Sequence, residues 1–171
     1  MMKIDARPGF AMAAALCVLA QAGAAAADGA PSESDRFFLG EAESACRNGD
    51  FPAFLWPFAN SEAVRARYDA SATKDFPIVM IDYSYVTSAS ERLFAAKGGD
   101  PRQLVYVQVD FSAPSSGVER VDWVPGRFEP GEGDGPGTLI EKTGPGGYLQ
   151  FRRAGDCWQL IEDIRNPERA R

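Results

Sequence analysis

Between residues 35 and 70, apolar side chains recur at the spacing of one face of an α-helix. Ser32 or Ser34 can cap the start of a first helix, and Gly49 stands where a C′ glycine would end it. Asp50 and Ser61 are placed to cap a second and a third helix. The apolar positions that define the three helices are Phe38, Ala42, Ala45 and Cys46, then Phe51, Phe54, Leu55 and Phe58, then Val64 to Tyr68.

From Phe76 onward, apolar and polar positions alternate with the period of a β-strand, and clusters of Gly and Pro divide the alternation into short runs. Strands are predicted at residues 76–87, 103–112, 117–125, 137–143, 147–154 and 156–165. Helices followed by strands predict an α+β fold, in which N-terminal helices pack on a curved antiparallel sheet. Residues 35–171 are predicted to form this single domain.

The alternation also predicts which side chains face the helices. One side of the strand at 103–112 is uniformly apolar, and this side should face the helices: Val105, Val107, Val109 and Phe111. In the last strand, a bond from Cys157 to Cys46 would turn Cys157 inward, together with Gln159, Ile161 and Asp163. Trp158, Leu160, Glu162 and Ile164 would then face outward. Tyr106 and Trp158 therefore predict an outer aromatic face, suited to a homodimer or another partner.

The first 27 residues differ in composition from the rest of the chain. Lys3 and Arg7 precede an Ala-rich apolar run, Phe10 to Ala27, which ends in small residues before Asp28. This order is typical of a secretory signal peptide, so we expect cleavage before Asp28 and a periplasmic or secreted protein. The run is interrupted by polar and Gly residues, which argues against a stable membrane anchor. Residues 28–34 are predicted to be a flexible polar leader.

Removal of residues 1–27 leaves 16 basic and 23 acidic residues, a net charge of −7 over 144 residues. An acidic surface argues against nucleic acid and anionic membranes as partners, because both are bound mainly through Lys and Arg. Two cysteines remain, Cys46 and Cys157. An even pair in an exported chain predicts a disulfide between them.

The chain contains no histidine, which removes Ser-His-Asp and Cys-His catalysis and most zinc sites. Ser71 and Lys74 have the spacing of a Ser-x-x-Lys motif but lack any supporting motif. The Gly-rich acidic segment 125–137 has neither a dinucleotide fingerprint nor EF-hand spacing, and it is interpreted as a hairpin loop. We therefore predict no catalytic residue, no metal and no cofactor. Carboxylate chemistry stays open through four acids in predicted strands: Asp82, Asp110, Asp122 and Asp163.

Both ends of the predicted domain resemble nuclear-transport-factor-2-like (NTF2-like) domains, which have a cystatin-like cone fold. The start carries Asp50-Phe51-x-x-Phe54-Leu55-x-x-Phe58 and then Val64-Arg65, and the end carries Tyr148 to Arg153, a turn, and Cys157-Trp158-Gln159-Leu160 running to Asp163. The resemblance covers most of residues 35–165. This superfamily includes enzymes, binding modules and dimerisation domains, so the resemblance does not select a function. Its isomerases and dehydratases often use His in the cone, which this chain lacks.

The leading hypothesis is an exported, non-enzymatic binding module for a small ligand or a protein partner. A small ligand would contact Tyr83, Tyr85, Gln159 and Asp163 inside the cone. One alternative is an isomerase, lyase or hydrolase that uses carboxylates and Tyr. The other is an inhibitor or immunity protein directed against an exported enzyme, for which a filled cone would be the mark.

Overall fold

A computed structural model describes residues 31–69, 75–129 and 137–166 of the chain. The predicted signal peptide, Ser71, Lys74 and most of the predicted loop at 125–137 lie outside the described residues. Pro31–Arg171 form one compact unit. Within the described ranges, no helix is long and apolar enough to cross a membrane.

The three predicted N-terminal helices are confirmed, with the expected caps. Helix α1 (Glu33–Asn48) begins at Ser32, whose Oγ accepts the backbone N–H of Asp35 at 3.0 Å. The helix ends at Gly49, whose φ of +67° suits a residue without a side chain. Asp50 caps α2 (Phe51–Asn60), and Ser61 caps α3 (Glu62–Tyr68). Because α1 starts at Glu33, the end of the predicted polar leader is helical.

The predicted strand at 76–87 is instead a hairpin. Strands β1 (Ile78–Ile81) and β2 (Ser84–Thr87) are antiparallel and joined by Asp82 and Tyr83. Both turn residues have positive φ, +44° and +63°, as a type I′ turn requires. A helix that the alternation did not predict, α4 (Ser88–Ala96), follows directly, and Thr87 caps it.

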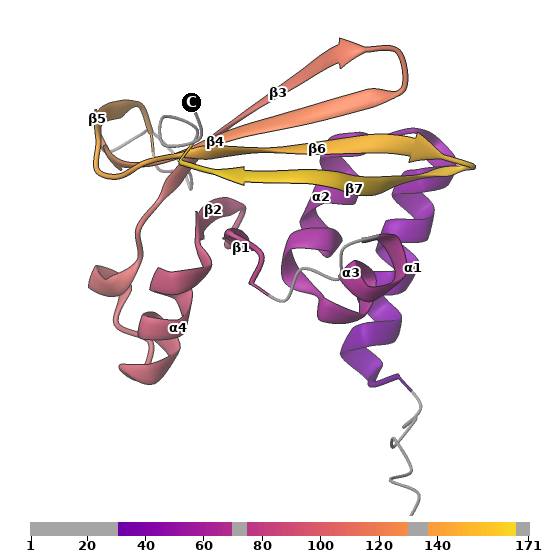
Figure 1. The fold of residues 1–171 in the computed structure, drawn as a ribbon. Helices are drawn as coiled ribbons and strands as arrows, with labels where there is room; N and C mark the ends of the chain where they lie inside the picture. The colour runs from indigo at the N-terminus through magenta and orange to yellow at the C-terminus, as the bar shows by residue number, and fades with distance from the viewer. Residues whose placement is uncertain (1–30, 70–74, 130–136, 167–171) are drawn as a thin grey trace, which may run out of the picture. The chain divides into compact units, whose positions relative to one another are not determined.

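The larger sheet is antiparallel and has the strand order β3-β4-β6-β7, with β5 paired to β4. Its strands are β3 (Val107–Ser115), β4 (Val118–Phe128), β5 (Leu139–Lys142), β6 (Gly147–Ala154) and β7 (Cys157–Arg165). Figure 1 shows α1, α2 and α3 on one side of this sheet, beneath β6 and β7. The α+β prediction is therefore confirmed.

Cross-strand partners share a face, so the register identifies the face of the sheet that meets the helices. On β3, Val107 is buried, and Val109 packs against the core. Phe111 remains 43% exposed, although its ring lies 6.1 Å from that of Phe51 on α2. The predicted inward positions Val107, Val109 and Phe111 thus face the helices, whereas Val105 precedes β3 and is 37% exposed.

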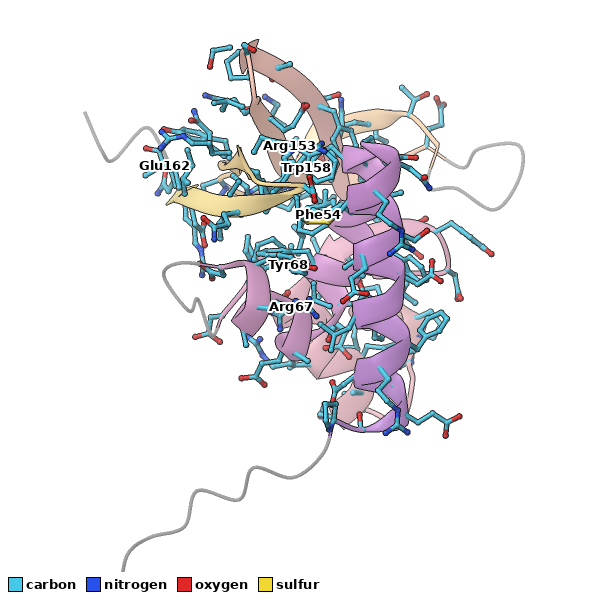
Figure 2. The ribbon with its side chains drawn as sticks, turned by 90° about the vertical axis from the view of Figure 1, so that its right-hand side faces the viewer. Phe54, Arg67, Tyr68, Arg153, Trp158 and Glu162 are labelled. Atoms are coloured by element: carbon cyan, nitrogen blue, oxygen red, sulfur yellow. A yellow bond between two sulfur atoms is a disulfide. The ribbon has the colours of Figure 1, made fainter. Side chains whose placement is uncertain are left out.

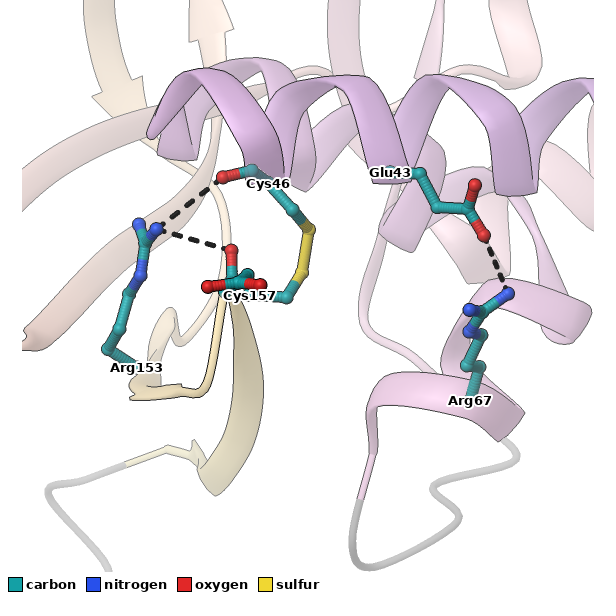
Figure 3. Close-up of a disulfide and its surroundings, with 6 residues drawn as sticks. Glu43, Cys46, Arg67, Arg153 and Cys157 are labelled. Carbon is teal, nitrogen blue, oxygen red and sulfur yellow. Dashed lines mark hydrogen bonds and ion pairs between the residues drawn. A yellow bond between two sulfur atoms is a disulfide. The ribbon is translucent and has the colours of Figure 1, made fainter.

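The predicted disulfide is present between Cys46 near the end of α1 and Cys157 at the start of β7, with a Cα–Cα distance of 4.6 Å (Figure 3). Arg153 reinforces the same junction. Its Nη2 donates to the carbonyl oxygens of Cys46 at 3.5 Å and Asp156 at 3.2 Å, and its guanidinium lies 4.6 Å from the Trp158 ring centre. The β6–β7 turn is therefore attached to the end of α1.

The predicted orientation of β7 is wrong at its first half. Trp158 and Leu160 are 2% and 1% exposed and belong to the core, whereas Gln159 and Ile161 face solvent. Cys157 follows the turn directly and reaches Cys46 at the end of the sheet, so its orientation does not set the parity of the strand. Because Trp158 is buried, the predicted outer aromatic face of Tyr106 and Trp158 does not exist.

The second half of β7 returns to the predicted orientation through a bulge. Phe151 pairs with Leu160, but Gln150 pairs with Glu162, so Ile161 is an extra residue without a partner. The extra residue inverts the alternation that follows. Asp163 consequently lies opposite Leu149 on the face that meets the helices.

Candidate functional site

The four residues predicted to bind a ligand occupy different environments. Tyr83 is at the tip of the β1–β2 hairpin and is 92% exposed. It borders a shallow depression of about 430 Å³ beside Leu104 and Tyr106. Tyr85, two residues further along, packs against the core, and burial raises the pKa of its phenol.

The other two predicted residues lie on opposite faces of β7. Gln159 is exposed, opposite Arg152 on the face away from the helices, so its predicted inward position is wrong. Asp163 is on the helix face, and only 12% of its side chain is exposed. Its carboxylate accepts a hydrogen bond from Nη2 of Arg165 at 2.8 Å. The predicted four-residue site is therefore not assembled as one group, and a ligand role for Asp163 or Tyr85 stays a prediction.

Aromatic rings fill the space between α2 and the β6–β7 end of the sheet. Phe54 lies beside Trp158 (Figure 2), with 5.4 Å between their ring centres. The Phe58 ring centre lies 5.6 Å from that of Phe54 and 5.1 Å from that of Phe151. Phe51 contacts Trp158 at 5.4 Å. All five side chains are at most 3% exposed. This part of the interior is packed core and offers no room to a ligand.

The face of the sheet away from the helices carries an ordered polar array, which we call the outer face. Two neighbouring rows of cross-strand partners form it. The first row is Asp110, Asp122, Tyr148 and Ile164, and the second is Ser112, Arg120, Gln150 and Glu162. The two rows hold three carboxylates and one guanidinium, and Arg152, opposite Gln159 in the next row of the same face, adds a second guanidinium, so the face stays acidic.

Arg120 is the centre of this array. Its Nε and Nη2 donate to the two carboxylate oxygens of Asp122 at 2.8 and 2.6 Å, and its guanidinium stacks 3.8 Å from the Tyr148 ring centre. The bonds to Asp122 raise the pKa of Arg120, and the charge of Glu162 acts in the same direction. A guanidinium held by two hydrogen bonds and a ring keeps one orientation before any partner arrives.

Asp110 lies directly opposite Asp122 and is held separately. The amide of Gln108 donates to both of its carboxylate oxygens, at 3.0 and 3.3 Å. The two aspartates border an open groove of about 870 Å³, whose other walls include Lys142 and Asn166. The groove exposes oriented carboxylates at the surface, so it can accept hydrogen bonds from a cationic group.

The four acids considered from the sequence lie in three different places. Asp110 and Asp122 face each other on the open surface of the sheet, and Asp163 forms an ion pair with Arg165. Asp82, the fourth acid considered from the sequence, is exposed in the hairpin turn. Among the described residues, no group of three His, Cys, Asp or Glu side chains could hold a metal ion.

The outer-face array was not predicted as a site, although its signal is in the sequence. Arg120 and Asp122 are two apart in a strand, so they must lie on one face. The alignment of Tyr148 and Glu162 with them depends on the register of three strands and on the bulge at Ile161, which the alternation alone does not reveal.

Comparisons with known proteins add one structural likeness. No protein-family model matches the chain, and no curated protein matches its sequence. A solved structure of an "NTF-2 like protein of unknown function" from Shewanella oneidensis MR-1 is similar at 15% identity and a TM-score of 0.24. The likeness covers 77% of this chain and 95% of that chain. The description of that protein names the fold type that this sequence resembles.

Proposed function

We propose that the protein is an exported, non-enzymatic binding module that holds a protein partner on the outer face. The observation that carries the proposal is the oriented array of Asp110, Asp122, Arg120 and Tyr148 on a sheet face that no helix covers in the described part of the chain. Side chains fixed before binding lose less conformational freedom when a partner arrives. The array therefore suits recognition of an external surface.

The charge of the outer face specifies the kind of partner. Its carboxylates outnumber its guanidinium groups, and the whole chain has a net charge of −6. Electrostatic complementarity then favours a partner that presents Lys or Arg side chains. The packed aromatic rings under β6 and β7 support a surface contact over an enclosed ligand.

Two features support export. The first 27 residues have the order of a signal peptide, and Cys46 is bonded to Cys157. Disulfides persist mainly in oxidising compartments, so the bond agrees with a periplasmic or extracellular location.

Site-specific photo-crosslinking in the host tests the proposed contact surface. A photoreactive residue would replace Gln150 at the centre of the outer face, and a second variant would carry it at Glu41, exposed on α1. We expect one protein to be crosslinked from position 150 and not from position 41. The charge-reversing change Asp110→Lys should abolish that crosslink, because it removes an acceptor and repels a cationic partner.

The matched control for the charge change is Glu41→Lys, which alters the net charge equally on the helical side. It should leave the crosslink from position 150 intact. Equal crosslinking from positions 41 and 150, or a crosslink that survives Asp110→Lys, would contradict the outer face as the binding surface.

An inhibitor or immunity role is the specific form of this proposal that the packed interior favours. In that case, the crosslinked partner is an exported enzyme, and adding the purified protein should lower its activity. If the enzyme keeps full activity in a saturated complex, the inhibitor role is wrong and the protein is a binding module that does not inhibit.

A further inference from the structure

A second groove lies on the other side of the molecule from the outer face. It has a volume of about 450 Å³ and is formed where the end of α2 meets β1 and α4. Its apolar wall consists of Phe76, Val79, Met80 and Ile81. We call it the α2–β1–α4 groove.

One wall of the groove is fixed by the side-chain amide of Asn60, which hydrogen-bonds to the backbone of Met80 as a neighbouring strand would. The Nδ2 of Asn60, the last residue of α2, donates to the Met80 carbonyl at 2.7 Å, and the Met80 N–H donates to Asn60 Oδ1 at 3.0 Å. These bonds use both ends of the amide. Helix and strand are thus held at a fixed separation, and the groove between them does not depend on a ligand for its form.

Arg65 is a half-buried cation in this wall. Its Nη1 donates to the carbonyl oxygens of Phe58 at 3.0 Å and Ala59 at 2.8 Å, which caps the end of α2. Its Nε is buried and has no hydrogen-bond partner among the described residues, a state shared only with Trp123 Nε1 in that part of the chain. Burial lowers the pKa of Arg65, against the charges of Glu62 and Asp69. A buried donor without an acceptor costs free energy.

The lining residues of the groove carry more positive than negative charge, although Glu62 and Asp69 lie near Arg65 outside the lining. Arg65 and Arg92 contribute two positive charges and Glu91 one negative charge, in a protein of net charge −6. A guanidinium next to an apolar wall matches a ligand with a carboxylate at one end and a hydrocarbon tail at the other.

We propose that the α2–β1–α4 groove binds a small amphiphilic monocarboxylate, with the carboxylate beside Arg65 and Arg92 and the tail against Val79, Met80 and Ile81. The carboxylate pairs with the charge of the Arg65 guanidinium where Arg65 lines the groove, and the buried Nε is not itself a contact. Glu91 repels the carboxylate and so limits the affinity. This site is independent of the outer face, and the failure of either proposal leaves the other standing.

Octanoate is the probe that tests the site, titrated into the purified protein at pH 7 and followed by amide chemical shifts. We expect the shifts to move at Met80, Ile81 and Arg92, with a dissociation constant of about 1 mM or lower, as is ordinary for a ligand of about ten non-hydrogen atoms. Octanol and octylamine carry the same tail without the negative charge. Both should bind at least about tenfold more weakly.

Three variants assign the charge contacts. Arg92→Gln, at an exposed position, should weaken octanoate binding about threefold, and Glu91→Gln should strengthen it by a similar factor. Arg65→Lys loses the fork geometry and should weaken binding about tenfold. If Arg65→Lys fails to fold, the two α4 variants still decide the test. Three outcomes would each overturn the proposal. They are equal binding of octanoate, octanol and octylamine, chemical-shift changes confined to the aromatic core, and unchanged octanoate affinity in both α4 variants.

Discussion

Residues that are close together in the chain can have very different surroundings in this protein. Tyr83 and Tyr85 are two apart in the hairpin, yet Tyr83 is 92% exposed and Tyr85 packs against the core. Burial disfavours the charged phenolate, which raises the pKa of Tyr85. The two tyrosines therefore form a natural pair for measuring the effect of burial.

The stability of the protein should fall above pH 10 in part because of Tyr85. Its folded pKa is raised, so above the unfolded pKa of about 10 the unfolded state loses a proton that the folded state keeps. This favours unfolding by about 1.4 kcal/mol for each pH unit beyond 10. Between pH 9 and pH 11, the free energy of unfolding should fall less in Tyr85→Phe than in wild type, as measured by urea denaturation.

Tyr83→Phe is the control for that comparison, since Tyr83 is almost fully exposed at the tip of the same hairpin. Its dependence on pH should match that of wild type. Identical alkaline profiles for wild type and Tyr85→Phe would show that the Tyr85 phenol is not buried as described.

At the scale of elements, the three N-terminal helices could be predicted residue by residue, because caps are local. Ser32, Asp50 and Ser61 each cap a helix through contacts within three residues in the chain. The bulge at Ile161 is different, since it exists only in the pairing of β7 with β6. The orientation taken from Cys157 placed Gln159 inward and Trp158 outward, opposite to their positions in the structure, and the bulge after Leu160 then returns Asp163 to the predicted face.

Helix α4 was not predicted for a related reason. Its sequence, SASERLFAA, follows β2 without a break, and Ser90 is its single fully buried residue. Such a short helix lacks the apolar stripe from which α1 and α2 were predicted. It is stabilised by contacts with distant residues instead, because Ser90 Oγ accepts the backbone N–H of Val105 at 3.0 Å. The α2–β1–α4 groove was invisible in the sequence because it depends on this helix.

The junction of α1 with β7 should depend strongly on its disulfide. Cys46 and Cys157 are 111 residues apart, and closing a loop of about that length restricts the unfolded chain by up to about 4–5 kcal/mol. The double variant Cys46→Ser/Cys157→Ser should lose about 2–5 kcal/mol in free energy of unfolding, measured by urea denaturation.

Reduction provides the control for that loss. Dithiothreitol should destabilise wild type to nearly the level of the double variant and leave the variant unchanged. A wild-type protein whose unfolding is insensitive to reductant would contradict a role for the bond in attaching β7 to α1.

At the scale of the whole molecule, three regions differ in their chemistry. Aromatic rings occupy the interior under β6 and β7, an acidic and oriented array occupies the outer face, and the α2–β1–α4 groove carries positive charge. The fold class followed from the order of helices and strands in the sequence. The placement of chemistry on faces needed the register, which is a property of pairs of strands.

The most direct test of the central claim is native mass spectrometry of the protein recovered from its host without reductant. We predict a chain that begins at Asp28, is two hydrogens lighter than its reduced form, and is bound to a protein partner. A full-length chain of 171 residues with free thiols, recovered without a partner, would contradict the account of an exported, disulfide-bonded binding module.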